Sequence, residues 1–235
     1  QELVGRQENV HFVKAGVGGT PSELGMVRFD RDVLRDGIEP DVVVVEFAVN
    51  DEGDETRGNC YESLVRKILK LPWHPAVILL FSVFADDSNL QERLIPVGER
   101  YDLPMVSVKN AVVPQFYDAS NRILTKNQFF YDRFHPSNLG HTIMADCLAN
   151  LYAQIRQRVE DEGVRDADYE PSVFAGAPAI GCSFDAIRLL DKKNDYANAE
   201  IDCGGFTLTD TELQSVEMDL ELELTPEFPY NWMYD

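Results

Sequence analysis

The sequence predicts an α/β protein in which helices pack on a parallel sheet. Two observations support this prediction. Short apolar runs alternate with amphipathic stretches between residues 10 and 158, which is the order of repeated strand–helix–strand units. One run, at residues 42–45, contains only valine, as expected of a strand covered on both faces. Right-handed crossovers between such units produce a parallel sheet.

The first predicted elements surround a glycine-rich turn. Residues 10–13 have the composition of a strand, and the turn at residues 16–19 follows. Polar residues at 20–23 can cap a helix that continues to about residue 34. A buried strand is then predicted at residues 41–47.

The rest of this region repeats the same alternation. In chain order, the predicted elements are a helix at 61–70, a strand at 76–84, a helix at 90–101, a short strand at 104–108 and a long amphipathic helix at 138–158. Pro96 is unfavourable within its predicted helix because it lacks a backbone N–H.

Charge divides the chain near residue 160. Residues 1–159 contain 17 basic and 22 acidic side chains, whereas residues 160–235 contain 4 and 19. We therefore expect one α/β domain at 1–160, then an acidic linker and the start of a β-rich domain at 161–235. Short strands are predicted there at 206–208 and at 216–224, where strict apolar/acidic alternation favours an antiparallel sheet.

Composition argues against several classes of partner. The formal net charge of −20 argues against binding to nucleic acid or to an anionic membrane surface. No apolar run approaches the roughly 18 residues of a membrane span. The four cysteines are widely spaced with no CxxC, so we expect neither a disulfide framework nor a zinc site. Nothing in the sequence indicates another metal or an organic cofactor, so none is expected. The chain opens on Gln1 without a signal peptide, which predicts a processed or cut N-terminus and leaves the compartment and the oligomeric state open.

Three polar loops contain the candidate functional residues. The first, Gly16-Val17-Gly18-Gly19-Thr20, can present backbone N–H groups to an anion or an oxyanion at a helix start. Its spacing does not match GxGxxG, and no GxxxxGK(S/T) phosphate loop exists in the chain. The alternative is a plain tight turn that uses glycine for positive φ.

The second loop, Phe47-Ala48-Val49-Asn50-Asp51, follows the valine-rich strand. The Asn50 amide, at the carboxyl end of a strand, can donate a hydrogen bond to an oxyanion. An ordinary Asn-Asp turn is the alternative. The preceding strand resembles a Walker B segment, but the chain has no Walker A partner for it.

The third loop runs from Asp132 to His141. Asp132 and His135 are three residues apart on a turn, so the carboxylate can orient the imidazole and leave its other nitrogen to act as a general base. Metal binding by Asp132, His135 and His141 is an alternative, although no further strong ligand stands at a suitable spacing. A capped loop without a catalytic role is the other alternative.

In this order, the three loops resemble those of the SGNH hydrolases, the superfamily of GDSL-type esterases and lipases. The segment KAGVGGTPSELG resembles the second block of the family, which implies that the Gly19 N–H contributes to an oxyanion hole. The segment EFAVND resembles the third block, whose asparagine, here Asn50, is another oxyanion donor. The segment DRFHPSNLGH resembles the fifth block, which implies that Asp132 and His135 belong to a Ser-His-Asp triad.

The resemblance covers roughly residues 5–158 and departs from the family in three places. The first block, with the nucleophilic serine and the first strand, is missing and is expected N-terminal to residue 1. Ser22, inside a helix start, and Ser183, in the acidic tail, do not suit the role. Ala48 replaces a glycine that is usual in the third block, and Lys14 stands where asparagine is common.

The resemblance implies a three-layer, flavodoxin-like α/β/α fold and a serine esterase without metal or cofactor. The motifs most resemble those of carbohydrate acetylesterases, so the expected substrate is a small-molecule or carbohydrate ester. The fragment alone is expected to be inactive, since its nucleophile is absent. A lipase or thioesterase on the same scaffold is one alternative, and a non-catalytic glycan-binding derivative that has lost its serine is another. A flavodoxin-like nucleotide binder would leave the Asp132–His135 pair unexplained.

Overall fold

The computed structural model describes residues 10–34, 37–163, 174–189, 200–210 and 233–235. The chain divides into two compact units, Gln1–Ile187 and Arg188–Asp235. The first unit contains all the helices and strands of the described residues and all the candidate site residues.

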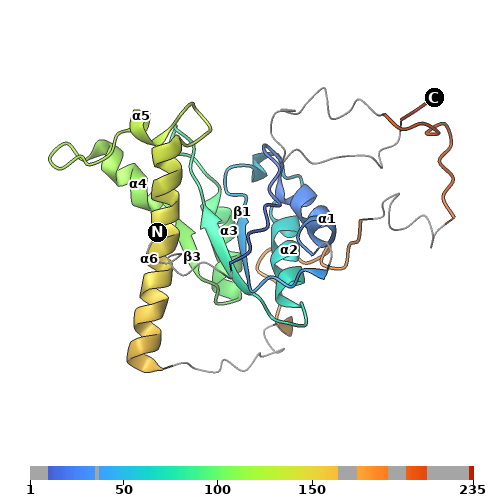
Figure 1. The fold of residues 1–235 in the computed structure, drawn as a ribbon, viewed down its shortest axis with the longest axis horizontal. Coiled ribbons are helices and arrows are strands. Elements are labelled where there is room, and N and C mark those ends of the chain that lie inside the picture. Colours follow the sequence, from blue (N-terminus) through green and yellow to red (C-terminus); the bar gives the residue numbers. More distant parts are fainter. Residues whose placement is uncertain (1–9, 35–36, 164–173, 190–199, 211–232) are drawn as a thin grey trace. The chain divides into compact units, whose positions relative to one another are not determined.

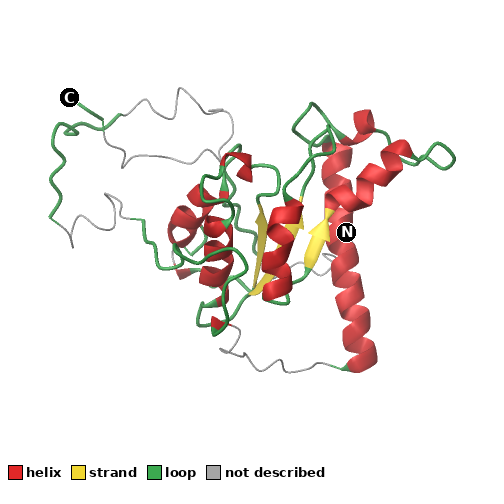
Figure 2. Ribbon diagram, turned by 180° about the vertical axis from the view of Figure 1, so that it is seen from behind, coloured by secondary structure: helices red, strands yellow, loops and turns green. Residues whose placement is uncertain are grey.

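A parallel three-stranded sheet lies at the centre of the first unit. Its strands are β1 (Val42–Glu46), β2 (Ala76–Phe81) and β3 (Met105–Ser107), in the order β1-β2-β3. Val42 pairs with Ala76 and Leu79 with Met105, and both pairs of strands are parallel. The predicted α/β class with a parallel sheet is therefore confirmed (Figure 2).

Helices lie on both faces of this sheet (Figure 1). In chain order they are α1 (Ser22–Asp32), the 3-10 turn η2 (Asp51–Gly53), α2 (Asn59–Leu69), α3 (Gln91–Arg100), α4 (Val108–Tyr117), α5 (Lys126–Phe129) and α6 (Asn138–Glu162). The helices α1, α2 and α3 share one hydrophobic core with the sheet, whereas α4, α5 and α6 share a second core on the other face.

The central strand β2 shows how sequence produces these layers. Val77, Leu79 and Phe81 join the core shared with α1, α2 and α3, while Ile78 and Leu80 join the core shared with α4, α5 and α6. Successive side chains of a strand point to opposite faces, so an uninterrupted apolar run fits a strand between two helical layers. Burying each of these side chains contributes about 1.5–3 kcal/mol.

The strand predicted at residues 41–47 is confirmed as β1, but two related expectations are wrong: the strand at residues 10–13 and the burial of β1 on both faces. Residues 10–13 form no strand, and Val10 and Phe12 are 57% and 73% exposed. Val42 and Val44 are 40% and 44% exposed, so β1 is not covered on both faces. Residues 10–13 have no partner strand in the described part of the chain, where β1 pairs only with β2, and extended backbone without a hydrogen-bonded neighbour is not held as a strand. Val43 and Val45 belong to the first core, so Val42 and Val44 point to the opposite face, where neither is part of the second core.

Two short helices follow β3 that the sequence pattern did not predict. Helix α4 begins directly after the strand, and the Ser107 hydroxyl caps it by accepting the Asn110 N–H at 3.1 Å. Pro114 obscured this helix because proline weakens any helical prediction. The long helix starts at Asn138 as predicted, but α6 continues to Glu162, beyond the predicted end at residue 158. It stops before Gly163, which has a φ of +78°.

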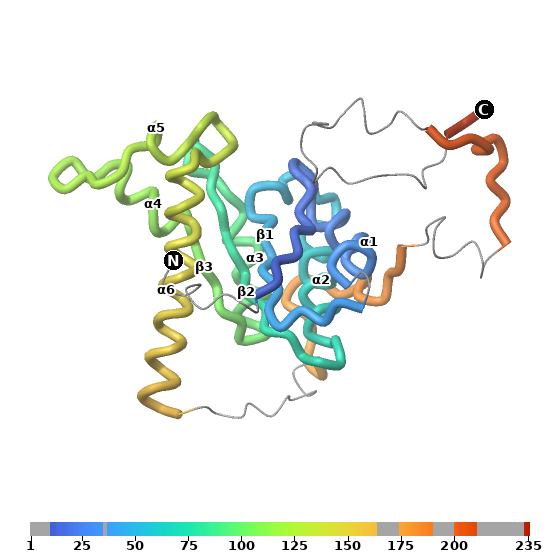
Figure 3. The backbone as a smooth tube through the Cα atoms, viewed as in Figure 1, coloured from blue at the N-terminus to red at the C-terminus, as the bar shows by residue number. Residues whose placement is uncertain are grey.

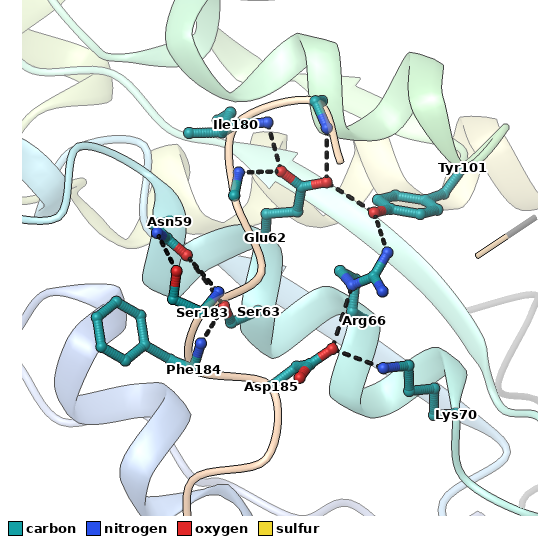
Figure 4. Close-up of polar contacts among 12 residues, drawn as sticks. Asn59, Glu62, Ser63, Arg66, Lys70, Tyr101, Ile180, Ser183, Phe184 and Asp185 are labelled. Atoms are coloured by element: carbon teal, nitrogen blue, oxygen red, sulfur yellow. Dashed lines mark hydrogen bonds and ion pairs between the residues drawn. The ribbon is translucent and has the colours of Figure 1, made fainter. Parts of the chain in front are cut away.

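The described segment 174–187 returns to the α/β unit after α6 and lies along α2 (Figure 3). We call this segment the strap. The carboxylate of Glu62, which is fully buried on α2, accepts the backbone N–H groups of Ala179, Ile180 and Gly181 at 2.8, 2.5 and 2.8 Å (Figure 4). It also accepts the Tyr101 hydroxyl at 2.6 Å.

Further polar and apolar contacts hold the strap on the α/β unit. Asp185 pairs with Arg66 at 3.3 Å and with Lys70 at 2.6 Å (Figure 4). Phe184 donates its N–H to the Ser63 hydroxyl at 3.2 Å. Several strap side chains pack on the first core: Phe174, Ile180, Phe184 and Ile187. The first unit therefore continues beyond the charge step near residue 160.

The second unit is described only at residues 200–210 and 233–235. Residues 206–208 do not form the predicted strand, because Leu208 makes only an isolated antiparallel bridge with Met233. The predicted strand at 216–224 lies outside the described residues. Across the described part of the chain, no helix combines the length and the apolar character that crossing a membrane requires.

Candidate functional site

Asp132 and His135 form a hydrogen-bonded pair. The His135 Nδ1 lies 2.8 Å from Asp132 Oδ2 and 3.1 Å from Oδ1. Asp132 Oδ1 also accepts the backbone N–H groups of Phe134 at 2.7 Å and of His135 at 2.8 Å. The carboxylate therefore closes the turn and holds the imidazole at the same time, as the spacing predicts.

The electrostatics of this pair suit a general base. The hydrogen bond from His135, with those from the two backbone N–H groups, lowers the pKa of Asp132 to about 2. Asp132 is thus ionised at neutral pH, and its carboxylate favours the tautomer in which Nδ1 carries the proton. The Nε2 atom is then a free acceptor, and the His135 side chain is 72% exposed.

Contacts with neighbouring segments fix this turn at the sheet edge. Phe130 and Pro136 form an antiparallel bridge across its base. The Arg133 carbonyl accepts the N–H of Ala85, in the loop after β2, at 3.1 Å. The Phe134 ring stands edge-on to Phe84 at 5.6 Å. These contacts attach the His135 turn to the loop that follows the carboxyl end of β2.

Asn50 lies at the carboxyl end of the adjacent strand. It precedes η2 in the loop after β1, and the buried Ala48 in this loop accepts the Leu90 N–H at 2.8 Å. The partly buried Asn50 side chain has no hydrogen-bond partner among the described residues. Because β1 and β2 are parallel, Asn50 and the His135 turn belong to the same edge of the sheet.

Gly19 occupies the turn before α1. Its φ of +69° is left-handed, a conformation that favours glycine. The Ser22 N–H at the start of α1 donates to Asp51 Oδ1 at 2.7 Å, which connects the glycine turn to the Asn50 loop. From the sequence, Asp51 was expected only to be a turn residue. The one feature of the sequence that pointed to it was its position directly after Asn50.

The structure brings together some of the predicted residues and not others. Asp132 and His135 are in direct contact, and the loops of Gly19 and Asn50 are joined through Asp51. Within the described residues, no contact links the pair to Gly19 or Asn50, and no hydroxyl approaches His135 Nε2. The arrangement supplies a general base and two sources of hydrogen-bond donors at one sheet edge.

The metal-binding alternative gains no support from the described residues. They contain no group of three His, Cys, Asp or Glu side chains that is suited to hold a metal ion. Among the described residues, one surface hollow lies beside α4 and α5 and another lies in the second unit, and neither is lined by Asp132 or His135.

Comparison with known proteins finds similarity at the level of structure. No protein-family model and no curated protein sequence matches the chain. The chain is similar to the crystal structure of a two-domain esterase active on acetylated mannans, co-crystallised with mannopentaose, with a TM-score of 0.60 and 29% identity over 74% of this chain and 43% of that chain. A second structure, also of a two-domain esterase active on acetylated mannans, matches with a TM-score of 0.54 and 32% identity over 68% of this chain and 40% of that chain.

The chain thus spans less than half the length of these esterases. Over the matched parts, the TM-scores of 0.60 and 0.54 indicate a shared fold, which in this chain has a parallel sheet between helical layers. The first unit of this chain is therefore an esterase-like α/β domain, structurally related to carbohydrate esterases.

Proposed function

We propose that this chain belongs to a serine ester hydrolase of the SGNH type that removes acetyl or other short acyl groups from carbohydrate. The observation that carries the proposal is the Asp132–His135 pair at the carboxyl edge of the sheet, in which Asp132 contacts Nδ1 and the His135 side chain is exposed. The nucleophilic serine would come from outside these 235 residues. The similarity to esterases active on acetylated mannans supports the choice of substrate class.

In this mechanism, His135 Nε2 takes the proton of the serine hydroxyl as the oxygen attacks the ester carbonyl. Asp132 keeps Nδ1 protonated and stabilises the imidazolium that forms. The negative charge on the former carbonyl oxygen is stabilised by the Gly19 N–H, the Asn50 amide and the serine N–H. His135 then returns the proton to the leaving sugar hydroxyl, and water releases the acyl group from serine by the reverse sequence of proton transfers.

The surface beside the imidazole is consistent with an extended substrate. The Phe134 ring lies 6.3 Å from the His135 ring and is 55% exposed, so it offers an apolar surface next to the general base. A lipase or thioesterase on the same scaffold remains the second proposal, and a non-catalytic glycan-binding derivative the third.

The test compares p-nitrophenyl esters of acetate, butyrate and octanoate with acetylated mannan, using the protein with its native upstream sequence. We expect turnover of acetate and of mannan-bound acetyl groups, with activity falling as the acyl chain lengthens. A preference for octanoate would favour the lipase alternative. A folded protein without any turnover would favour the non-catalytic derivative. The 235-residue chain alone is expected to show little activity, since its nucleophile is absent.

Replacing Asn50 with alanine removes one oxyanion donor. We expect kcat for p-nitrophenyl acetate to fall by about 10²–10³-fold with little change in KM, because the donor acts on charge that develops in the transition state. Asn89→Ala is the control, since Asn89 lies in the loop after β2 and its amide donates to the Ser82 carbonyl at 2.7 Å. An equal loss in both variants would contradict the role of Asn50.

A further inference from the structure

Asp51 is a fully buried carboxylate that the mechanism above does not use. Its Oδ1 accepts the Ser22 N–H at 2.7 Å, across 29 positions of sequence. Its backbone carbonyl accepts an Arg93 Nη1 proton at 3.1 Å. Its Oδ2 has no hydrogen-bond partner in the described part of the chain, and the same is true of the buried Ser22 hydroxyl. The buried Asp51 side chain thus accepts one backbone hydrogen bond, from the Ser22 N–H, among the described residues.

This bond joins the two elements that are proposed to stabilise the oxyanion. Ser22 opens α1, three residues after Gly19, and Asp51 directly follows Asn50. The Gly19 turn contributes no strand to the described sheet, and the backbone bonds around it are local. The long-range bond from Ser22 to Asp51 therefore fixes the start of α1 relative to the Asn50 loop.

We infer that Asp51 is a positioning residue, which holds the Gly19 N–H and the Asn50 amide at a fixed separation so that both donate to one oxyanion. The inference rests on the proposed function. Oxyanion donors act only when they lie about 2.7–3.1 Å from the developing charge, and an error near 1 Å costs about 10²-fold in rate. A buried, charge-assisted link is well suited to this task, because water does not compete for it.

The charge of Asp51 is set by its surroundings. Burial raises its pKa to about 6, although the hydrogen bond from Ser22 opposes this rise. Other titratable or charged groups face it from four elements or their flanking residues, and they are Glu46 of β1, Asp54 after η2, Cys60 and Tyr61 of α2, and Arg93 of α3. At neutral pH Asp51 is therefore mostly ionised, and it becomes neutral as the pH falls below about 6.

The activity test compares Asp51→Ala with Asp51→Asn in the protein with its native upstream sequence. Alanine removes the acceptor, so we expect kcat for p-nitrophenyl acetate to fall on the order of 10–100-fold with KM little changed. Asparagine retains an acceptor oxygen, so it is expected to restore kcat to within about threefold of wild type. Glu52→Ala, an exposed acidic residue of the same turn, is the control and is expected to retain wild-type activity.

A double-mutant cycle separates positioning from a general loss of structure. If Asp51 acts through the oxyanion hole, Asp51→Ala costs less than about threefold in the Asn50→Ala background, because one donor is already absent. An undiminished loss in that background would overturn the inference. If wild-type protein hydrolyses no ester, or if His135→Ala keeps full activity, the proposed esterase function is wrong. The positioning role of Asp51 is then wrong as well, because it depends on that function.

A second measurement uses the chain itself and does not depend on activity. In wild type, the Ser22 amide proton is expected to shift in NMR spectra with a midpoint near pH 6, as Asp51 titrates. In Asp51→Asn this shift is expected to vanish while the other amides of α1 keep their positions. Ser22→Pro, at the first residue of α1, removes the same bond from the other side if Asp51→Ala does not fold. A Ser22 amide that is insensitive to pH in wild type would overturn the link.

Discussion

Replacing His135 with alanine is expected to lower kcat for p-nitrophenyl acetate by about 10⁴-fold or more in the protein with its native upstream sequence, since no other described group is held in place to take the serine proton. The expectation follows from the geometry, because Asp132 accepts from Nδ1 at 2.8 Å and leaves Nε2 free. Steady-state kinetics and active-site titration with a serine-directed phosphonate both measure the loss.

His141→Ala provides the matched control. His141 is exposed on the first turn of α6, six residues after His135, and its side chain makes no hydrogen bond with the described residues. We expect this variant to keep wild-type kcat. Equal losses in both variants would contradict the triad and support the metal-binding alternative, which a chelator titration would then decide. Near-normal kcat in His135→Ala would remove the observation on which the proposed function rests.

The second large effect is on stability, and it concerns Glu62. We expect Glu62→Ala to lower the free energy of unfolding by about 3 kcal/mol or more, because three backbone N–H groups of the strap would lose their acceptor. The Tyr101 hydroxyl, which accepts from Arg66 at 2.8 Å and donates to Glu62, would lose its acceptor as well. Urea denaturation measures the loss, and hydrogen exchange at residues 179–181 locates it.

Glu99→Ala on the exposed side of α3 is the control, with an expected change within about 0.5 kcal/mol. Glu62→Gln separates charge from shape, since the amide keeps one acceptor oxygen but turns an NH₂ group toward the strap. We expect an intermediate loss for this variant. Unchanged stability and unchanged exchange at 179–181 in Glu62→Ala would show that the strap does not depend on this carboxylate.

The spacing of apolar residues in the sequence was sufficient to predict most helices and strands of the α/β unit. The apolar run of β2 and the amphipathic stripes of α2 and α6 predicted these elements to within a few residues. The reason is that a helix or strand buried on one or two faces has apolar residues at a regular spacing in the sequence. The Asp132–His135 contact was equally predictable, since three residues on one turn decide it. The strands predicted at residues 10–13 and 206–208 do not form. Both are short apolar stretches, and whether such a stretch forms a strand depends on a partner strand and not on its composition.

By itself, the sequence determined the class of fold, the order of its three strands and of α1, α2, α3 and α6, and the residue types at the candidate site. Only the tertiary structure decided that residues 174–187 return to α2, and that Asp51 bonds to Ser22 across 29 positions. These contacts bring together groups that are distant in the chain. A carboxylate such as Glu62 or Asp51 has no local feature that marks it as buried, because its burial depends on which distant N–H groups the fold brings to it.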